Sequence, residues 1–226
     1  MDRLFNLFSN SSNYADSVDF AFAYITIISI IMLVGISATV ILFVYKYHEK
    51  KHPRPIQTHG NVFIEIIWIV IPTILVISMY FVSTNDYIAL RQRADIDIEI
   101  DVEARMYSWA FTYENGHVSD TLYVPVGKTI KFNLTSADVI HSFYIPALRI
   151  KEDCVNNRST FMIVQPEKTG EYVITCAEYC GILHWDMMTK YIVVDEQTFQ
   201  TWVESGSNDT ADDEVSVDAD SEYADN

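Results

Sequence analysis

Residues 173–188 read Val-Ile-Thr-Cys-Ala-Glu-Tyr-Cys-Gly-Ile-Leu-His-Trp-Asp-Met-Met. Within this stretch Cys176, Cys180, His184 and Met187 follow one another at spacings of four, four and three residues. Thiolate, imidazole and thioether groups together are typical of copper sites that transfer electrons, in which the methionine is a weak axial ligand. The stretch therefore predicts a metal centre held in a loop, with the rest of the chain folded to support it.

A second imidazole, that of His141, lies thirty-five residues before Cys176. A one-copper blue site uses a single cysteine, and zinc sites are built mainly from cysteine, histidine and carboxylates. Two cysteines, two histidines and a methionine fit two copper ions that share both thiolates. Each ion then takes one imidazole and one weak axial ligand: Met187 on one side, and a backbone carbonyl, that of Glu178, on the other. From the residues alone, a redox or zinc-binding cysteine pair beside a core methionine is the alternative.

The segment that contains these ligands is built from short strands. Between residues 95 and 103 apolar residues alternate with Asp and Glu, which predicts a strand with one buried face. Turn sequences such as Asn115-Gly116 separate the segments that follow. Further strands are expected at 106–113, 121–124, 129–134, 141–145, 160–164, 172–175 and 190–194. Many short strands divided by turns predict a β-sandwich over residues 94–203.

Two apolar segments come before the sandwich. Residues 20–45 carry no charged side chain, and residues 61–85 are also mostly apolar, so each can cross a hydrocarbon core about 30 Å thick. The connecting loop, residues 46–60, is rich in Lys and Arg, which predicts that it lies in the cytoplasm with residues 1–19 outside. Glu65 lies about one turn inside the second span. A carboxylate there either has a function or snorkels to the interface.

Composition limits the possible partners. The chain has 226 residues and a formal net charge of −16, which argues against nucleic acid as a partner. Residues 204–226 contain many acids and no Lys or Arg, which predicts a disordered acidic tail. The third cysteine, Cys154, is predicted to be free and buried. The remaining histidines are expected to be solvated: His48, His52, His59 and His117.

The pattern Cys-x-Glu-x-Cys-Gly-x-x-His-x-x-Met resembles the dinuclear copper (CuA) motif of cytochrome c oxidase subunit II. Residues 138–146, Asp-Val-Ile-His-Ser-Phe-Tyr-Ile-Pro, are similar to the upstream ligand segment of that family, and the similarity reaches from the first span to about Trp202. The resemblance implies a membrane α + β protein, in which a two-helix transmembrane hairpin precedes a cupredoxin-like β-sandwich. It also implies a bacterial inner membrane, with the copper domain on the periplasmic side.

The function implied by the resemblance is that of an electron-transfer subunit of a respiratory cytochrome c oxidase. Electrons would pass from cytochrome c through two copper ions to haem in subunit I, where oxygen is reduced to water with proton translocation. The implied partners are subunit I with its haem and CuB, subunit III, cytochrome c and the lipid bilayer. The alternative is the CuA subunit of a nitric oxide reductase.

The same resemblance implies roles for single residues. Glu65, with Trp68 and Pro72 at the family's spacing, would stand at the mouth of a proton path. Glu178 and Asp153 would hold a magnesium or manganese ion at the interface with subunit I. For Asp153 the alternative is a surface ion pair with a neighbouring Lys or Arg. Asp138 resembles a carboxylate that docks the donor.

The sequence departs from the family pattern at two places. The family has Trp-x-Trp in the strand before the Asn-Gly turn, and its first Trp receives the electron, whereas this chain has Tyr107 there and keeps Trp109 as the second aromatic. The family's Ile-Pro-Gly-Arg is replaced by Val-Asn-Asn-Arg at residues 155–158, which alters the loop near the expected subunit interface.

Overall fold

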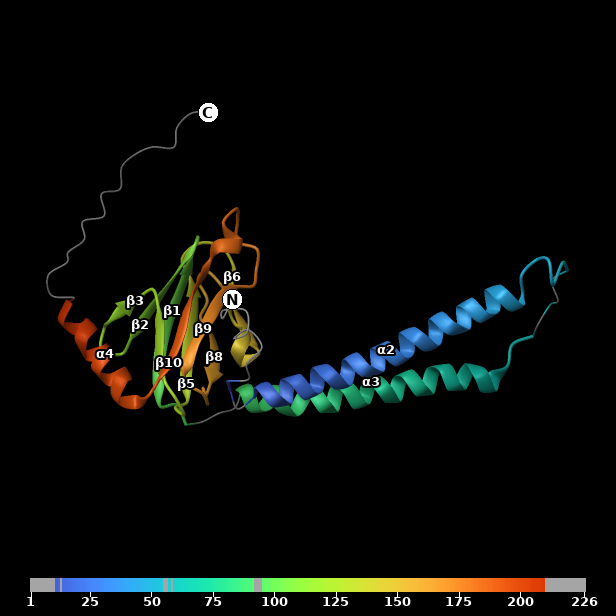
Figure 1. Cartoon of the computed structure of the whole chain (residues 1–226), viewed down its shortest axis with the longest axis horizontal. Helices are drawn as coiled ribbons and strands as arrows, with labels where there is room; N and C mark the ends of the chain where they lie inside the picture. Colours follow the sequence, from blue (N-terminus) through green and yellow to red (C-terminus); the bar gives the residue numbers. More distant parts are fainter. Residues whose placement is uncertain (1–10, 13, 55–56, 58, 92–94, 210–226) are drawn as a thin grey trace, which may run out of the picture. The chain divides into compact units, whose positions relative to one another are not determined.

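The computed structural model describes residues 11–12, 14–54, 57, 59–91 and 95–209 (Figure 1). Two compact units divide the chain: a helical unit over residues 13–94, and a β unit formed by the segments on either side of it. The expected outer segment over residues 1–10 and most of the expected acidic tail lie outside the described residues.

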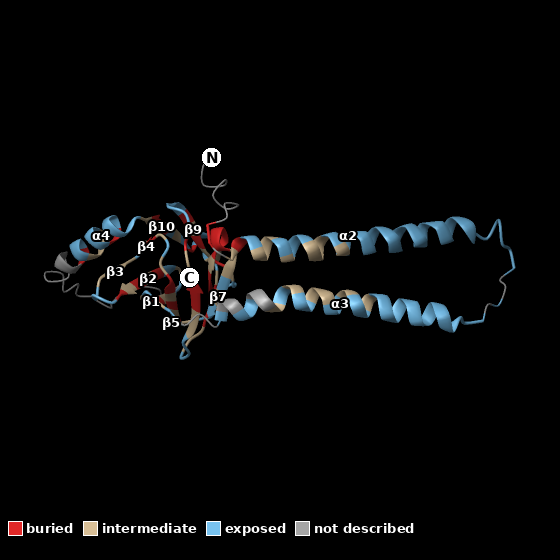
Figure 2. Ribbon diagram, turned by 90° about the horizontal axis from the view of Figure 1, so that it is seen from below, coloured by how far each residue is buried: buried red, intermediate tan, exposed pale blue. Residues whose placement is uncertain are grey.

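The helical unit consists of α2, Ala15–Lys46, and α3, Val62–Arg91. Both helices are long and apolar enough to cross a membrane, over Ala15–Lys46 and Val62–Thr84. Their large apolar side chains are exposed along almost the whole hairpin (Figure 2), as expected of helices that face lipid. The Tyr24 hydroxyl lies 2.9 Å from Ser78 Oγ, which joins the two helices by a polar contact.

The β unit is a sandwich of two five-stranded sheets. One sheet has the order β3-β2-β1-β5-β8 and the other has the order β4-β10-β9-β6-β7. The first sheet contains β1 Ile98–Arg105, β2 Ser108–Tyr113, β3 Val118–Ser119, β5 Ile130–Ser136 and β8 Thr160–Val164. The second contains β4 Leu122–Pro125, β6 His141–Ile145, β7 Ile150–Cys154, β9 Gly170–Cys176 and β10 Met188–Val194. Every predicted strand has a counterpart, and two strands were not predicted, the short β3 and β7.

The alternating pattern of the sequence produces the core between the sheets. Ile100, Val102 and Ala104 on β1 are fully buried, whereas the acids between them point outward. Phe143 on β6 faces them from the other sheet, with its ring centroid 5.3 Å from that of Trp109. Replacing such an aromatic core residue with Ala typically costs about 3–5 kcal/mol, so these contacts fix how one sheet sits on the other.

A helix that the sequence did not predict follows the last strand. This helix, α4, spans Glu196–Asp209, and its first turn is capped by Asp195, whose Oδ1 accepts the Thr198 N–H at 2.9 Å. The buried Phe199 and the half-buried Trp202 pack its inner face on the sandwich. The last turn of α4 lies within the stretch that composition assigned to an acidic tail, so ordered structure continues past residue 204.

The prediction that His117 is solvated is wrong. Its ring stacks on that of Tyr113 with centroids 5.8 Å apart, and meets that of Trp202 edge-on at 4.7 Å. His117 is half-buried because α4 covers it. His48, His52 and His59 are exposed, as expected.

Candidate metal centre

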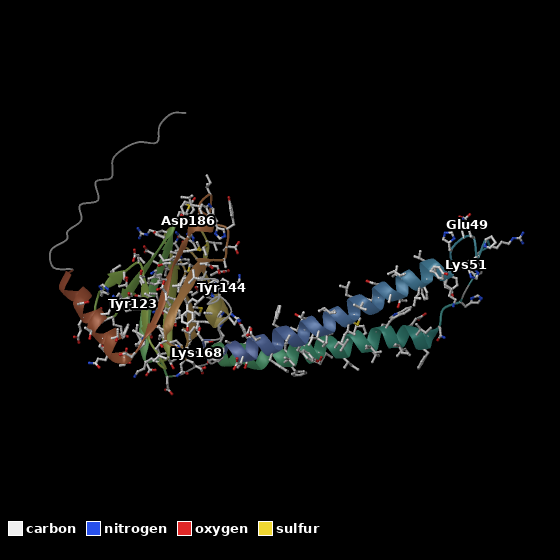
Figure 3. All side chains as sticks on the ribbon, viewed as in Figure 1. Glu49, Lys51, Tyr123, Tyr144, Lys168 and Asp186 are labelled. Carbon is white, nitrogen blue, oxygen red and sulfur yellow. The ribbon has the colours of Figure 1, made fainter. Side chains whose placement is uncertain are left out.

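The predicted ligands meet at one end of a single sheet. His141 is the first residue of β6 and Cys176 is the last residue of β9. The chain then forms a loop with Cys180, passes through a short 3-10 helix at His184–Asp186, and reaches Met187 directly before β10 (Figure 3). Because β9 pairs with both β6 and β10, the sheet itself brings these segments together.

The donor atoms lie within a few ångströms of one another. The two sulfurs, Cys176 Sγ and Cys180 Sγ, are 3.9 Å apart. Cys176 Sγ lies 3.8 Å from Nδ1 of His141, and Cys180 Sγ lies 3.5 Å from Nδ1 of His184 and 3.8 Å from the Met187 sulfur. Each cysteine therefore has one imidazole beside it.

The backbone carbonyl of Glu178 accepts a hydrogen bond from the Cys176 thiol at 3.1 Å. This carbonyl therefore lies on the Cys176 side of the cluster, opposite Met187, whose sulfur is next to Cys180. The side chain of Glu178 is exposed. The structure thus has a carbonyl oxygen next to Cys176 and a thioether next to Cys180.

Burial favours the protonated thiols of Cys180 and Cys154. Burial and the neighbouring Cys176 thiol raise the pKa of Cys180 to about 11, so without metal this group stays protonated near neutral pH. A bound metal would displace that proton, which makes metal affinity rise with pH. Cys154, the cross-strand partner of His141, is free and fully buried, as predicted, and burial raises its pKa to about 12.

Asp138 holds the outer side of the His141 ring. Its Oδ1 accepts from His141 Nε2 at 2.8 Å and from the Val139 N–H at 2.7 Å, and its Oδ2 accepts from the Met106 N–H at 2.7 Å. Burial opposes ionisation of Asp138, but these hydrogen bonds outweigh it and lower the pKa of the carboxyl group. A hydrogen bond on the far ring nitrogen fixes the orientation of a ligand histidine. Asp138 therefore leaves Nδ1 of His141 aimed at the cluster.

Two aromatic residues, Tyr107 in the turn before β2 and Trp109 on β2, lie beside this centre. Trp109 is buried, its ring meets that of His141 edge-on at 6.3 Å, and its indole N–H has no partner among the described residues. Tyr107 packs against Gly181, where an added Cβ would lie 3.2 Å from the Tyr107 Cζ atom and closer still to its hydroxyl. With φ of 137°, Gly181 has a backbone conformation that favours glycine.

Other residues singled out in the sequence lie apart from this cluster. Among the described side chains, the group of His, Cys and carboxylate atoms close enough to share an ion consists of His141, Cys176 and Cys180. Asp153 is exposed on β7, and Glu65 belongs to the helical unit. The altered loop contains Asn157 at φ 57°, so an asparagine takes the left-handed conformation that the family's glycine would suit.

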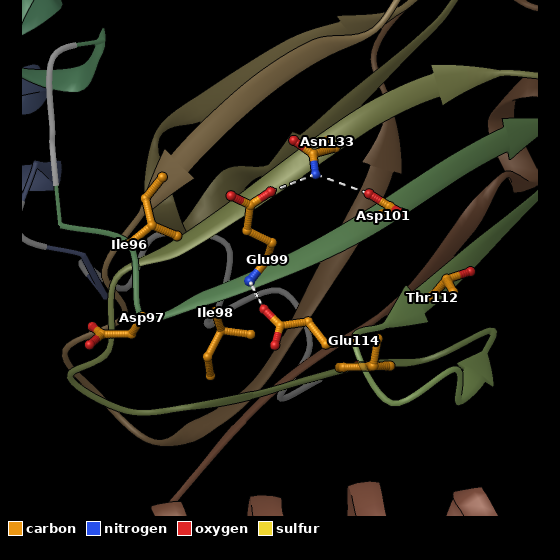
Figure 4. Close-up of a pocket in the computed structure, with 9 residues that line it drawn as sticks. Ile96, Asp97, Ile98, Glu99, Asp101, Thr112, Glu114 and Asn133 are labelled. Carbon is orange, nitrogen blue, oxygen red and sulfur yellow. Dashed lines mark hydrogen bonds between the residues drawn. The ribbon is translucent and has the colours of Figure 1, made fainter.

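The outer face of the first sheet carries an acidic hollow at the end of β1 remote from Met106 (Figure 4). Asn133 Nδ2 donates to Glu99 Oε2 and to Asp101 Oδ1, both at 3.0 Å. Hydrogen bonds from Asn133 and Lys131 lower the pKa of Glu99. Much of the acidic charge of β1 is therefore paired and lies away from the metal centre.

The donor set fits copper. It combines two thiols, two imidazoles, a thioether and a carbonyl oxygen, and copper is the metal for which sulfur and imidazole ligands with weak axial partners are typical. The aromatic and aliphatic core behind the ligands keeps them in place.

Comparisons with known proteins agree with this geometry. Two family models match: the transmembrane domain of cytochrome c oxidase subunit II over residues 4–85 and its periplasmic domain over residues 95–196. Cytochrome c oxidase subunit 2 of Thermostichus vulcanus is 29% identical over 85% of this chain and 76% of its own length. That of Alkalihalophilus pseudofirmus is 32% identical over 80% of this chain and 57% of its own length. The periplasmic domain of subunit II (CoxB) of Bradyrhizobium japonicum is 29% identical, with a TM-score of 0.50, over 53% of this chain and 100% of that one.

Proposed function

The chain belongs to the cytochrome c oxidase subunit II family, and we propose that its CuA-type domain carries electrons from a cytochrome c to the haem of subunit I. In the assembled oxidase this transfer would support the reduction of oxygen to water and proton translocation. The comparisons give no support to the alternative of a nitric oxide reductase subunit.

The observation that carries the proposal is the convergence of the donor atoms, with Cys176 Sγ and Cys180 Sγ 3.9 Å apart and one imidazole beside each. The residues that would hold two copper ions are His141, Cys176, Glu178 through its carbonyl, Cys180, His184 and Met187. When bound, such a pair supplies reversible one-electron chemistry. The chain contributes ligands fixed at strand ends and a largely buried site, so the donor atoms need not move when the charge changes.

Metal analysis of the purified full-length chain tests this directly. Two copper ions per chain and a mixed-valence electron paramagnetic resonance signal are expected, and Cys176→Ser or Cys180→Ser should abolish the signal. Cys154→Ser is the matched control, because Cys154 is a buried cysteine that contributes no donor atom to the cluster. One copper ion with a blue-copper spectrum would contradict the proposal.

The proposed entry point for electrons is Tyr107, with Trp109 behind it against His141. Tyr107 packs on Gly181, next to a ligand cysteine, and its neighbour Met106 is 46% exposed. Asp138 stands here as the proposed docking carboxylate, although it also binds the His141 ring. Stopped-flow reduction by a basic cytochrome c should slow with salt and in Tyr107→Ala, and should be indifferent to deletion of residues 210–226. Rates insensitive to salt and to Tyr107 would exclude this surface.

The remaining proposals concern the membrane complex. Glu65 lies in the first turn of α3, where a proton path into subunit I would begin. The exposed carboxylates of Glu178 and Asp153 would hold a magnesium or manganese ion shared with subunit I. The lysine-rich loop supports the proposal that the hairpin turn lies in the cytoplasm and the copper domain on the periplasmic side of a bacterial inner membrane, beside subunits I and III. Manganese binding tests the proposed shared ion. The assembled complex should bind manganese and lose this binding in Asp153→Asn, whereas the substitution should have no such effect on the chain alone.

A further inference from the structure

A groove of about 520 Å³ lies at the end of α2, where the chain turns toward α3. One wall is apolar and consists of Val40, Ile41 and Val44, which are 56%, 67% and 66% exposed. From Val40 to the end of α2 at Lys46 the helix rises about 9 Å, so this wall occupies the last turns of the apolar helix, directly before the charged hairpin turn.

The rim of the groove is cationic. It consists of Tyr45, His48, Lys50 and Lys51, and none of the described residues that line the groove is a carboxylate. Glu49 belongs to the same turn but is not part of the lining (Figure 3). Two lysines therefore stand over an apolar wall that carries no opposing charge.

The structure holds this rim in place. The Lys51 N–H donates to the His48 carbonyl at 2.8 Å, and the Lys50 N–H donates to His48 Nδ1 at 3.1 Å. The Lys51 Nζ atom lies 3.6 Å from the centre of the Tyr45 ring, a cation–π distance. Since Nδ1 of His48 accepts a hydrogen bond, the neutral ring carries its proton on Nε2 and offers a further donor.

We propose that this groove binds one anionic phospholipid of the membrane leaflet at the hairpin turn. The phosphodiester contacts Lys50, Lys51 and the His48 N–H, and an acyl chain lies along Val40, Ile41 and Val44. Clustered basic residues directly beside a membrane helix attract anionic lipids. A charged loop alone binds only the headgroup. The apolar wall adds a surface for an acyl chain of the same lipid molecule.

Two simpler modes of binding would respond differently to substitution. A basic loop can attract the anionic leaflet diffusely, in which case any two of its cations contribute equally. A phosphate site without a lipid tail would bind inorganic phosphate, and the apolar wall would be irrelevant. The chain offers a matched control for the diffuse mode: Lys46 and Arg54 lie at the two ends of the same turn and carry the same charge, but do not line the groove.

Native mass spectrometry of the purified full-length chain in neutral detergent tests the proposal. The chain is titrated with phosphatidylglycerol, and separately with phosphatidylcholine of the same acyl chains. One phosphatidylglycerol should be retained per chain, at least about tenfold more tightly than phosphatidylcholine. Lys50→Gln with Lys51→Gln should reduce that affinity at least about tenfold, whereas Lys46→Gln with Arg54→Gln should change it less than about threefold.

A second variant separates the groove from its charges. Val44→Trp fills the apolar wall and keeps every cation, so it should also reduce phosphatidylglycerol binding by about tenfold, and circular dichroism confirms that the helices are intact. Millimolar inorganic phosphate should fail to displace the lipid. Equal losses in the two double variants, no effect of Val44→Trp, or displacement by inorganic phosphate would each overturn the proposal.

Discussion

Asp138→Asn is expected to weaken copper binding without unfolding the β unit. In the structure one carboxylate oxygen accepts from His141 Nε2 and the Val139 N–H, and the other accepts from the Met106 N–H. An asparagine side chain has one acceptor oxygen and one NH2 group. In either orientation the NH2 group faces one of these N–H donors, so at least one hydrogen bond is lost. The substitution also removes the negative charge that supports all three hydrogen bonds.

The size of the effect follows from these contacts. A hydrogen bond to a charged group contributes about 1.5–3 kcal/mol. The Asp138 side chain is 28% exposed, so water replaces part of what is lost and the lower half of that range applies. A loss of about 2 kcal/mol corresponds to a roughly 30-fold lower copper affinity, within the 10–100-fold range for residues that orient a metal ligand.

Competition with a chelator, measured on the full-length chain, gives the affinity. The nitrogen chemical shifts of His141 give a second readout, because loss of the Nε2–H···Oδ1 bond changes them even where binding survives. Asp101→Asn is the control, since Asp101 is an acid of the hollow remote from the centre. An affinity unchanged within twofold, or an equal loss in Asp101→Asn, would refute the positioning role of Asp138.

Three further outcomes are expected. Gly181→Ala should reduce copper retention and stability more than Gly127→Ala, whose expected cost in stability is roughly 1–2 kcal/mol. Both glycines have positive φ, but of the two only Gly181 would bring a Cβ against an aromatic side chain. Equal losses of stability in the two variants, measured by thermal unfolding, would disprove this. Hydrogen bonds from the backbone N–H and then the hydroxyl of Thr198 lower the pKa of Asp195. The stability that this helix cap contributes is therefore fully present above the pKa of the unfolded chain, near 3.8, and is lost as pH falls through the lower pKa of the folded chain. The protection of the first-turn amides of α4 against exchange, relative to the intrinsic rate at each pH, should fall below about pH 4 in the native chain but not in Asp195→Asn, which still caps. A transition shared by both would exclude Asp195 as its source. Glu65→Gln should slow turnover of the assembled oxidase with copper content intact; unchanged turnover would leave Glu65 as a side chain that only snorkels.

The spacing of soft ligands sufficed to predict that a Cys/His cluster forms here, because residue identity carries most of that chemistry. The donor atoms of Cys176 and His141 meet as expected, and even the carbonyl of Glu178 could be placed from the ligand count. The role of Asp138 toward His141 could not be predicted. A resemblance suggested an exposed docking carboxylate, and only the β6 geometry shows that it reaches the ring three residues away.

The other errors have a physical cause as well. The end of α4, from residue 204, was assigned to the acidic tail because acids and small polar residues dominate the composition of that stretch. The apolar face of the helix is supplied by Phe199 and Trp202, which come before that stretch. Their spacing of three residues, after the capping Asp195, could have indicated the helix. The half-burial of His117 depends on that helix covering it, so one missed element produced both mistakes.

The proposed copper ligands come from the start of β6, the end of β9 and the loop that joins β9 to β10, and the opposite sheet contributes neighbours such as Trp109. Both ends of the ligand loop are therefore anchored in one layer. A small shear of one sheet over the other changes the aromatic contacts of the core, but leaves the hydrogen-bonded ladder that joins β6, β9 and β10 intact. A docking partner that presses on the outer face of the first sheet is therefore expected to leave the spacing of His141 and Cys176 unchanged, because the strands that carry them are hydrogen-bonded to each other.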